Sequence, residues 1–133
     1  MNLVEKTDLP NGLVLQVWDK SRVIAPDTTK VELGIVLDVT VREEYFSDPA
    51  DFRQVVKVFG QVISYEYTKE RTFVNTKDRE RVFNELLADF SRDSLPYISR
   101  AHFPARFAMS KLQDIRQHPY RYRDILEVHA SGE

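Results

Sequence analysis

The sequence of 133 residues has no cysteine and only four glycines, at positions 12, 34, 60 and 132. Without cysteine, the chain can form no disulfide, no thiolate metal site and no thiol nucleophile. Glycines so far apart cannot build a glycine-rich phosphate loop, and the G-x-S-x-G and H-E-x-x-H motifs are missing as well. These absences argue against nucleotide hydrolysis, zinc proteolysis and α/β-hydrolase chemistry.

Long apolar runs are also missing. None approaches the roughly 18 to 20 residues that a helix needs to cross a bilayer, so we expect no membrane protein. Near the start, Glu5, Lys6 and Asp8 occupy the region where a secretory signal has its apolar core, which predicts a cytoplasmic protein. The net charge of -2 predicts no general attraction to nucleic acid or anionic lipid.

The composition is that of an ordered globular protein, with 42% hydrophobic and 30% charged residues. A chain of this length commonly forms one domain around one core. We therefore expect residues 1–133 to form a single domain. Residues 119–133 hold only Ile125, Leu126 and Val128 as aliphatic anchors and are the candidate for a flexible tail.

Alternating side chains predict three strands. In residues 30–42 the odd positions are all aliphatic, namely Val31, Leu33, Ile35, Leu37, Val39 and Val41. This period of two indicates a long strand with one buried face. Residues 12–25 predict a partner strand, and the turn residues at 26–29 join the two in an antiparallel hairpin. Residues 61–74, with Ile63, Tyr65 and Tyr67 at alternate positions, predict the third strand.

Two segments predict helices. Residues 47–60 have Asp48 as N-cap, Pro49 at the first helical position and Gly60 at the exit. The β-branched residues of this segment favour a strand instead, and we prefer the helix. Residues 77–90 predict an amphipathic helix whose apolar stripe packs on the sheet, formed by Val82, Phe83, Leu86, Leu87 and Phe90.

The C-terminal third has a looser pattern. Pro96 and Pro104 exclude one continuous helix, so we expect an irregular segment that wraps the core, with a short helix from about residue 109. The predicted fold class is therefore α+β. It comprises an antiparallel sheet of three or more strands, one main amphipathic helix on one face, and an irregular C-terminal segment.

Two residue pairs in this third, Pro96–Tyr97 and Phe103–Pro104, are similar to the Pro-Tyr and Phe-Pro pairs late in bacterial export chaperones that bind unfolded chains. The resemblance covers only these four residues, and the two pairs are separated by several residues fewer here than in those chaperones. It assigns no family.

Residues 100–124 carry six cations and two anions on an otherwise acidic chain. A local basic surface with interleaved aromatic rings can bind single-stranded nucleic acid. The candidate binding residues there are Arg100, Arg106, Arg116, Tyr120, Arg121, Tyr122 and Arg123; Tyr65 and Tyr67 of the third strand complete the set. Phe103 and Phe107 are interpreted as core. Nucleic-acid binding is the alternative to the favoured function below.

A third alternative is an enzyme or metal site built from His102, His118 and His129. No two of them have the i, i+4 spacing that places both rings on one helix face. The acidic pairs, such as Asp89 with Asp93, are interpreted as solvated faces. We assign no catalytic residue, no metal ligand and no cofactor.

The favoured hypothesis is a small binding domain without chemistry of its own, which self-associates as a homo-oligomer or binds a protein partner. It follows from the sheet, because three strands leave two edges. We expect residues 30–42 and 61–74 to offer unpaired backbone groups there.

Overall fold

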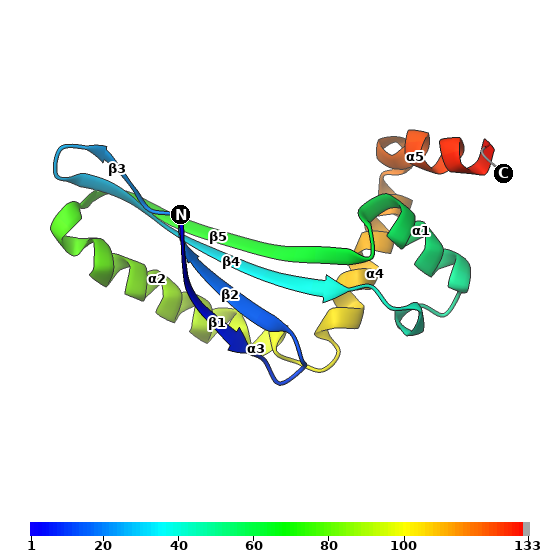
Figure 1. Cartoon of the computed structure of the whole chain (residues 1–133), viewed down its shortest axis with the longest axis horizontal. Helices are drawn as coiled ribbons and strands as arrows, with labels where there is room; N and C mark the ends of the chain where they lie inside the picture. Colours follow the sequence, from blue (N-terminus) through cyan, green and yellow to red (C-terminus); the bar gives the residue numbers. More distant parts are fainter. Residues whose placement is uncertain (132–133) are drawn as a thin grey trace. The chain divides into compact units, whose positions relative to one another are not determined.

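The computed structural model describes the backbone of residues 1–131 and the side chains of residues 1–126 (Figure 1). Its strands are β1 (Asn2–Asp8), β2 (Val14–Asp19), β3 (Arg22–Ala25), β4 (Thr28–Thr40) and β5 (Val62–Asn75). Its helices are α1 (Pro49–Phe59), α2 (Arg79–Asp93), α3 (Leu95–Ile98), α4 (Phe103–Gln117) and α5 (Pro119–Ser131), with 3-10 turns at Glu43–Tyr45 and Thr76–Asp78. The predicted α+β class is confirmed. None of these helices is long and apolar enough to cross a membrane.

The chain forms two compact units. The first comprises residues 1–37 and 65–100, and the second comprises residues 38–64 and those from 101 onward. Both β4 and β5 contribute residues to each unit.

The five strands form one sheet in the order β1-β2-β4-β3, with β5 also paired to β4. The pairs β1–β2, β2–β4 and β3–β4 are antiparallel. The strand expected over residues 12–25 is two strands, β2 and β3. They separate because Ser21 bonds to its neighbours: its N–H donates to Asp19, and its Oγ accepts from the N–H of Glu32. The hairpin between β3 and β4 is confirmed.

The core of the first unit is built from the alternating face of β4 and the stripe of α2. Its nearly fully buried residues include Leu15, Val17, Val31, Leu33, Ile35, Leu37, Val82, Phe83, Leu86 and Phe90. The rings of Tyr67 on β5 and Phe90 on α2 lie 5.1 Å apart. Both predicted periodicities are therefore confirmed, except that Leu87 is only half-buried.

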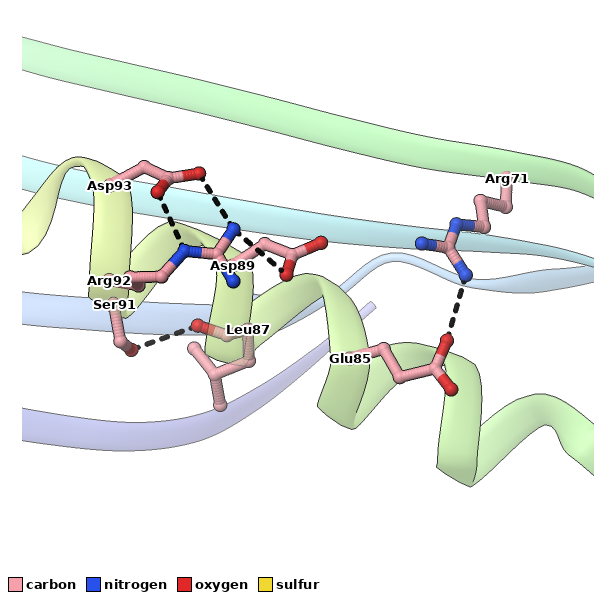
Figure 2. Close-up of polar contacts among 7 residues, drawn as sticks. All are labelled: Arg71, Glu85, Leu87, Asp89, Ser91, Arg92 and Asp93. Atoms are coloured by element: carbon pink, nitrogen blue, oxygen red, sulfur yellow. Dashed lines mark hydrogen bonds and ion pairs between the residues drawn. The ribbon is translucent and has the colours of Figure 1, made fainter.

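Polar contacts surround this packing at the exposed rim of α2. Arg71 of β5 binds Glu85 at 2.8 Å, and Arg92 binds Asp89 and Asp93 of its own helix (Figure 2). Asp89 and Asp93 thus contact an arginine on a solvated face of α2. This agrees with the interpretation of the pair as part of a solvated face and not as a catalytic site.

In the second unit, α1 confirms the helix preferred for residues 47–60. The Asp48 carboxylate accepts the N–H of Ala50 at 2.9 Å, Pro49 begins the helix and Gly60 ends it at φ 90°. Val55 is fully buried in this helix. The free energy gained by burying its side chain outweighs the intrinsic preference of valine for a strand. The other nearly fully buried residues of this unit include Val39, Val41, Ile63, Phe103, Ala108, Leu112 and Ile115.

The C-terminal segment corrects the expectation of irregular structure, because it consists mostly of α3, α4 and α5. As predicted, no single continuous helix spans Pro96 and Pro104, but both residues lie within helices. Each lies in the first turn of its helix, where a backbone N–H has no intrahelical acceptor to lose. The helix expected from about residue 109 begins at Phe103, and residues 119–131, the candidate flexible tail, form α5.

Candidate functional site

The two tyrosines proposed as binding residues on β5 lie against the core of the first unit. Tyr67 is half-buried beside Phe90. Tyr65 is also half-buried, and burial raises the pKa of its hydroxyl. Arg100, at the end of the same unit, is exposed, and its carbonyl accepts the side-chain amide of Asn11 at 2.9 Å.

The remaining candidates belong to α4 and α5 of the second unit, where Asp114 is the centre of a polar cluster. The hydroxyl of Tyr122 donates to the Asp114 carboxylate, and this hydrogen bond raises the pKa of Tyr122. Arg121 lies 3.6 Å and His118 3.8 Å from the same carboxylate. The ring of Tyr122 packs edge-on against Phe59 at 5.3 Å. Tyr122 therefore joins α5 to α4 and α1 and does not offer a free aromatic face.

The other cations of this group differ in their surroundings. Arg116 binds Asp51 of α1 at 3.1 Å, while Arg106 and Arg123 are exposed. Tyr120 is the most exposed aromatic side chain of the group, at 84%. Two of the predicted basic residues, Arg116 and Arg121, thus already have a carboxylate neighbour, which reduces the positive charge available to a polyanion.

The histidines do not form a site among the described residues. His102 and His118 are exposed and flank the 15-residue helix α4. At 1.5 Å per residue, that helix separates them by roughly 24 Å. The side chain of His129 lies outside the described residues. Where side chains are described, no three potential His, Cys, Asp or Glu ligands come together.

The sequence predicted that residues 30–42 and 61–74 form the free edges of the sheet, and the structure agrees only for the second of these segments. β4 is not an edge, because β2, β3 and β5 all pair with it. In the described part of the chain, β5 pairs only with β4, and β1 pairs only with β2. β3 likewise pairs only with β4. The edge expected on residues 61–74 is therefore present, and further edges lie on β1 and on the short strand β3.

β1 was missed by sequence reasoning. Its side chains mix Leu3 and Val4 with Glu5 and Lys6 and show no clear alternation. The available signal was the Pro-Asn-Gly turn at residues 10–12, which is typical of a hairpin. Gly12 adopts φ 88° there, and Leu9 and Leu13 close the turn.

The geometry of this hairpin decides which backbone groups of β1 are free. The N–H of Leu9 donates to the carbonyl of Leu13 at 2.8 Å. Hydrogen-bonded and non-hydrogen-bonded pairs alternate along antiparallel strands. In the register Thr7↔Leu15, Lys6↔Gln16 and Asp8↔Val14, Thr7 therefore bonds to β2. The N–H and carbonyl groups of Lys6 and Asp8 point away from β2, toward the free edge.

All seven side chains of β1 are exposed. Among the described residues, neither Lys6 nor Asp8 has an ion-pair partner. The β1 edge, meaning the outward backbone groups and side chains of residues 2–8, therefore combines unpaired hydrogen-bonding groups with unpaired charges.

Comparison with protein-family models, with curated proteins and with solved structures finds no match to this chain. The four-residue likeness to export chaperones gains no support from these comparisons. The function is therefore inferred from the residues and their geometry.

Proposed function

We propose that this protein functions by binding protein, and that a second polypeptide adds a strand to the β1 edge. The observation that carries this proposal is the outward direction of the Lys6 and Asp8 backbone groups on a strand whose side chains are all exposed. An added strand would satisfy these groups with main-chain hydrogen bonds, and its side chains would supply specificity. The proposal needs no catalytic residue.

The edges on β3 and β5 are less suited to this role. β3 has only four residues and a register shift between Val23 and Ala25, and short, irregular edge strands are poor templates for pairing.

Three successive charged residues, Lys69, Glu70 and Arg71, lie in the middle of β5. Glu70 binds Lys30 at 2.9 Å, and Arg71 binds Glu85 at 2.8 Å. Phe73 adopts φ 58°, which interrupts the regular strand geometry. Charges already paired within the chain and a break in strand geometry reduce the ability of an edge to accept another strand. β1 also has an irregularity, but it lies between Leu3 and Glu5, before Lys6 and Asp8.

The test removes one outward donor. Lys6→Pro deletes an N–H that makes no bond to β2, and proline is tolerated at such edge positions. Lys6→Arg is the matched control, because it keeps both the N–H and the charge. The immobilised full chain is exposed to an extract of its source cells. The polypeptide retained most strongly, whether another protein or this chain, is then purified for calorimetry against each variant.

We expect binding to be lost in Lys6→Pro and kept in Lys6→Arg, with circular dichroism showing that both variants are folded. Equal binding by the two variants, or no retained polypeptide, would contradict the proposal.

A second candidate, binding of single-stranded nucleic acid, is supported by one observation, the 84% exposure of Tyr120 next to the exposed Arg121 in α5. An exposed ring beside arginines can stack on a base. Fluorescence anisotropy with a labelled oligonucleotide should then show affinity that falls steeply with salt and is lost in the Arg121→Glu, Arg123→Glu double variant. No binding at low salt would end this candidate.

A further inference from the structure

The β1 edge carries charges of opposite sign at its two outward positions. Lys6 lies opposite Gln16 and Asp8 opposite Val14, so both side chains are on one face of the sheet. Thr7 lies opposite the buried Leu15, so its side chain is on the other face, which α2 covers further along the sheet. A second polypeptide at this edge would therefore meet a positive charge, a hydroxyl and a negative charge in sequence.

We propose that the partner is a second copy of this chain, and that the two β1 strands pair antiparallel around a two-fold axis at Thr7. This inference rests on the proposed function and names its partner. Lys6 of each copy stands opposite Asp8 of the other and exchanges two main-chain hydrogen bonds with it. The contact thus forms four main-chain hydrogen bonds and two ion pairs.

This register is selected by charge. A two-fold axis perpendicular to the sheet keeps each side chain on its own face, so the register can change only in steps of two residues. A shift of one step in one direction places Lys6 opposite Lys6 of the other copy. A shift of one step in the other direction places Asp8 opposite Asp8 of the other copy. Like charges directly opposite one another destabilise a sheet, whereas opposite charges and threonine pairs stabilise it. The pairing centred on Thr7 is therefore the favoured one of the three.

The contact is small, and its ion pairs are exposed. Exposed ion pairs contribute little each and are screened by salt. The dimer is therefore expected to dissociate on dilution and to weaken as the salt concentration rises.

A charge-exchange series tests the register by sedimentation velocity over a range of concentrations. Lys6→Asp alone places two aspartates opposite each other in both pairs, and Asp8→Lys alone places two lysines there. Each single variant should dimerise roughly tenfold more weakly than the wild-type chain. The double variant Lys6→Asp, Asp8→Lys restores opposite charges and should dimerise like the wild type.

An equimolar mixture of the two single variants gives the sharpest result. In the mixed dimer, both pairs again join aspartate to lysine, so the mixture should associate more strongly than either single variant does alone. Lys69→Asp, on the edge of β5, is the matched control and should leave dimerisation unchanged.

Cross-linking tests the position of the axis, since the chain has no native cysteine. Thr7 would form a non-hydrogen-bonded pair with its copy, in which the Cα atoms are about 4.5 Å apart. That distance lies within the range of a disulfide. Thr7→Cys should therefore oxidise rapidly to a covalent dimer. In Lys6→Cys and Asp8→Cys the like positions lie two residues out of register, and cross-linking should be several-fold slower.

The results separate this inference from the proposed function. A wild-type chain that stays monomeric at all concentrations, or equal cross-linking of the three cysteine variants, overturns self-pairing. If the wild-type chain then binds a different polypeptide and Lys6→Pro abolishes that binding, strand addition at β1 stands with another partner. If nothing binds, both proposals fall.

Discussion

At the scale of single residues, adjacent positions have different surroundings. Tyr120 and Tyr122 both lie in α5, yet Tyr120 is largely exposed while Tyr122 donates to Asp114 and packs on Phe59. The sequence presents both as tyrosines between cations. Their difference arises because a helix turns by about 100° per residue, so residues two apart face in nearly opposite directions.

Leu86 and Leu87 of α2 provide a matched pair for a stability prediction. Leu86 is 2% exposed, whereas Leu87 is half-buried at the edge of the stripe. Leu86→Ala should lower the free energy of unfolding by about 2 to 5 kcal/mol, because it removes apolar contacts and leaves a cavity. Leu87→Ala should cost clearly less, although sequence periodicity alone predicts equal losses. Urea unfolding measures both, and equal values would contradict the packing described for α2.

At the scale of elements, the start of α1 depends on a cap. The Asp48 carboxylate accepts the N–H of Ala50 at 2.9 Å. Asp48→Ala should lower the free energy of unfolding by about 1 kcal/mol, because a helical N–H loses its partner. Asp48→Asn keeps a side-chain acceptor and is the control, with a change of only a few tenths expected. Chemical denaturation of the two variants should therefore separate them, and identical midpoints would argue against the cap.

The contact between β5 and α2 predicts a dependence on pH. Hydrogen bonds from Arg71 and then Arg81 lower the pKa of Glu85 from its ordinary value of 4.5. A carboxylate with a lowered folded pKa stabilises the protein above its unfolded pKa, and this contribution is lost as pH falls through the folded value. The stability difference between wild type and Glu85→Gln should therefore shrink as pH decreases below about 4.5. Urea unfolding at a series of pH values measures it, and a constant difference would show that Glu85 keeps no such contact in solution.

At the scale of the whole molecule, β4 and β5 each contribute residues to both compact units. Local unfolding of one unit would then disturb strands of the other, which favours a single cooperative transition. The single tryptophan, Trp18, belongs to the first unit and reports on it by fluorescence. Ellipticity at 222 nm is dominated by helices, and most helical residues, those of α1, α4 and α5, belong to the second unit, while α2 and α3 belong to the first. We expect the two signals to follow the same denaturation curve, and separate midpoints would mean that the units unfold as two domains.

Much of the fold follows from the sequence. The strand at residues 30–42, the helix from Asp48 to Gly60 and the stripe of α2 were all predicted, because each depends on spacing or capping within a few residues. Of the helices after residue 94, α3 and α5 were missed and α4 was predicted to begin too late, at about residue 109, because Pro96 and Pro104 were interpreted as breaks although each occupies a first turn. The candidate edge on β1 was missed as well, because no regular alternation marks residues 2–8.

The sequence by itself determined which face of the strand at residues 30–42 and of α2 is apolar, the faces that carry the buried Leu33 and Leu86. Only the tertiary structure decided which strands lie at the edges of the sheet, and that Lys6 and Asp8 direct their backbone groups outward. The physical reason is that the apolar face of an element depends on residues a few positions apart, whereas a backbone group is free or bonded according to which distant strand lies beside it.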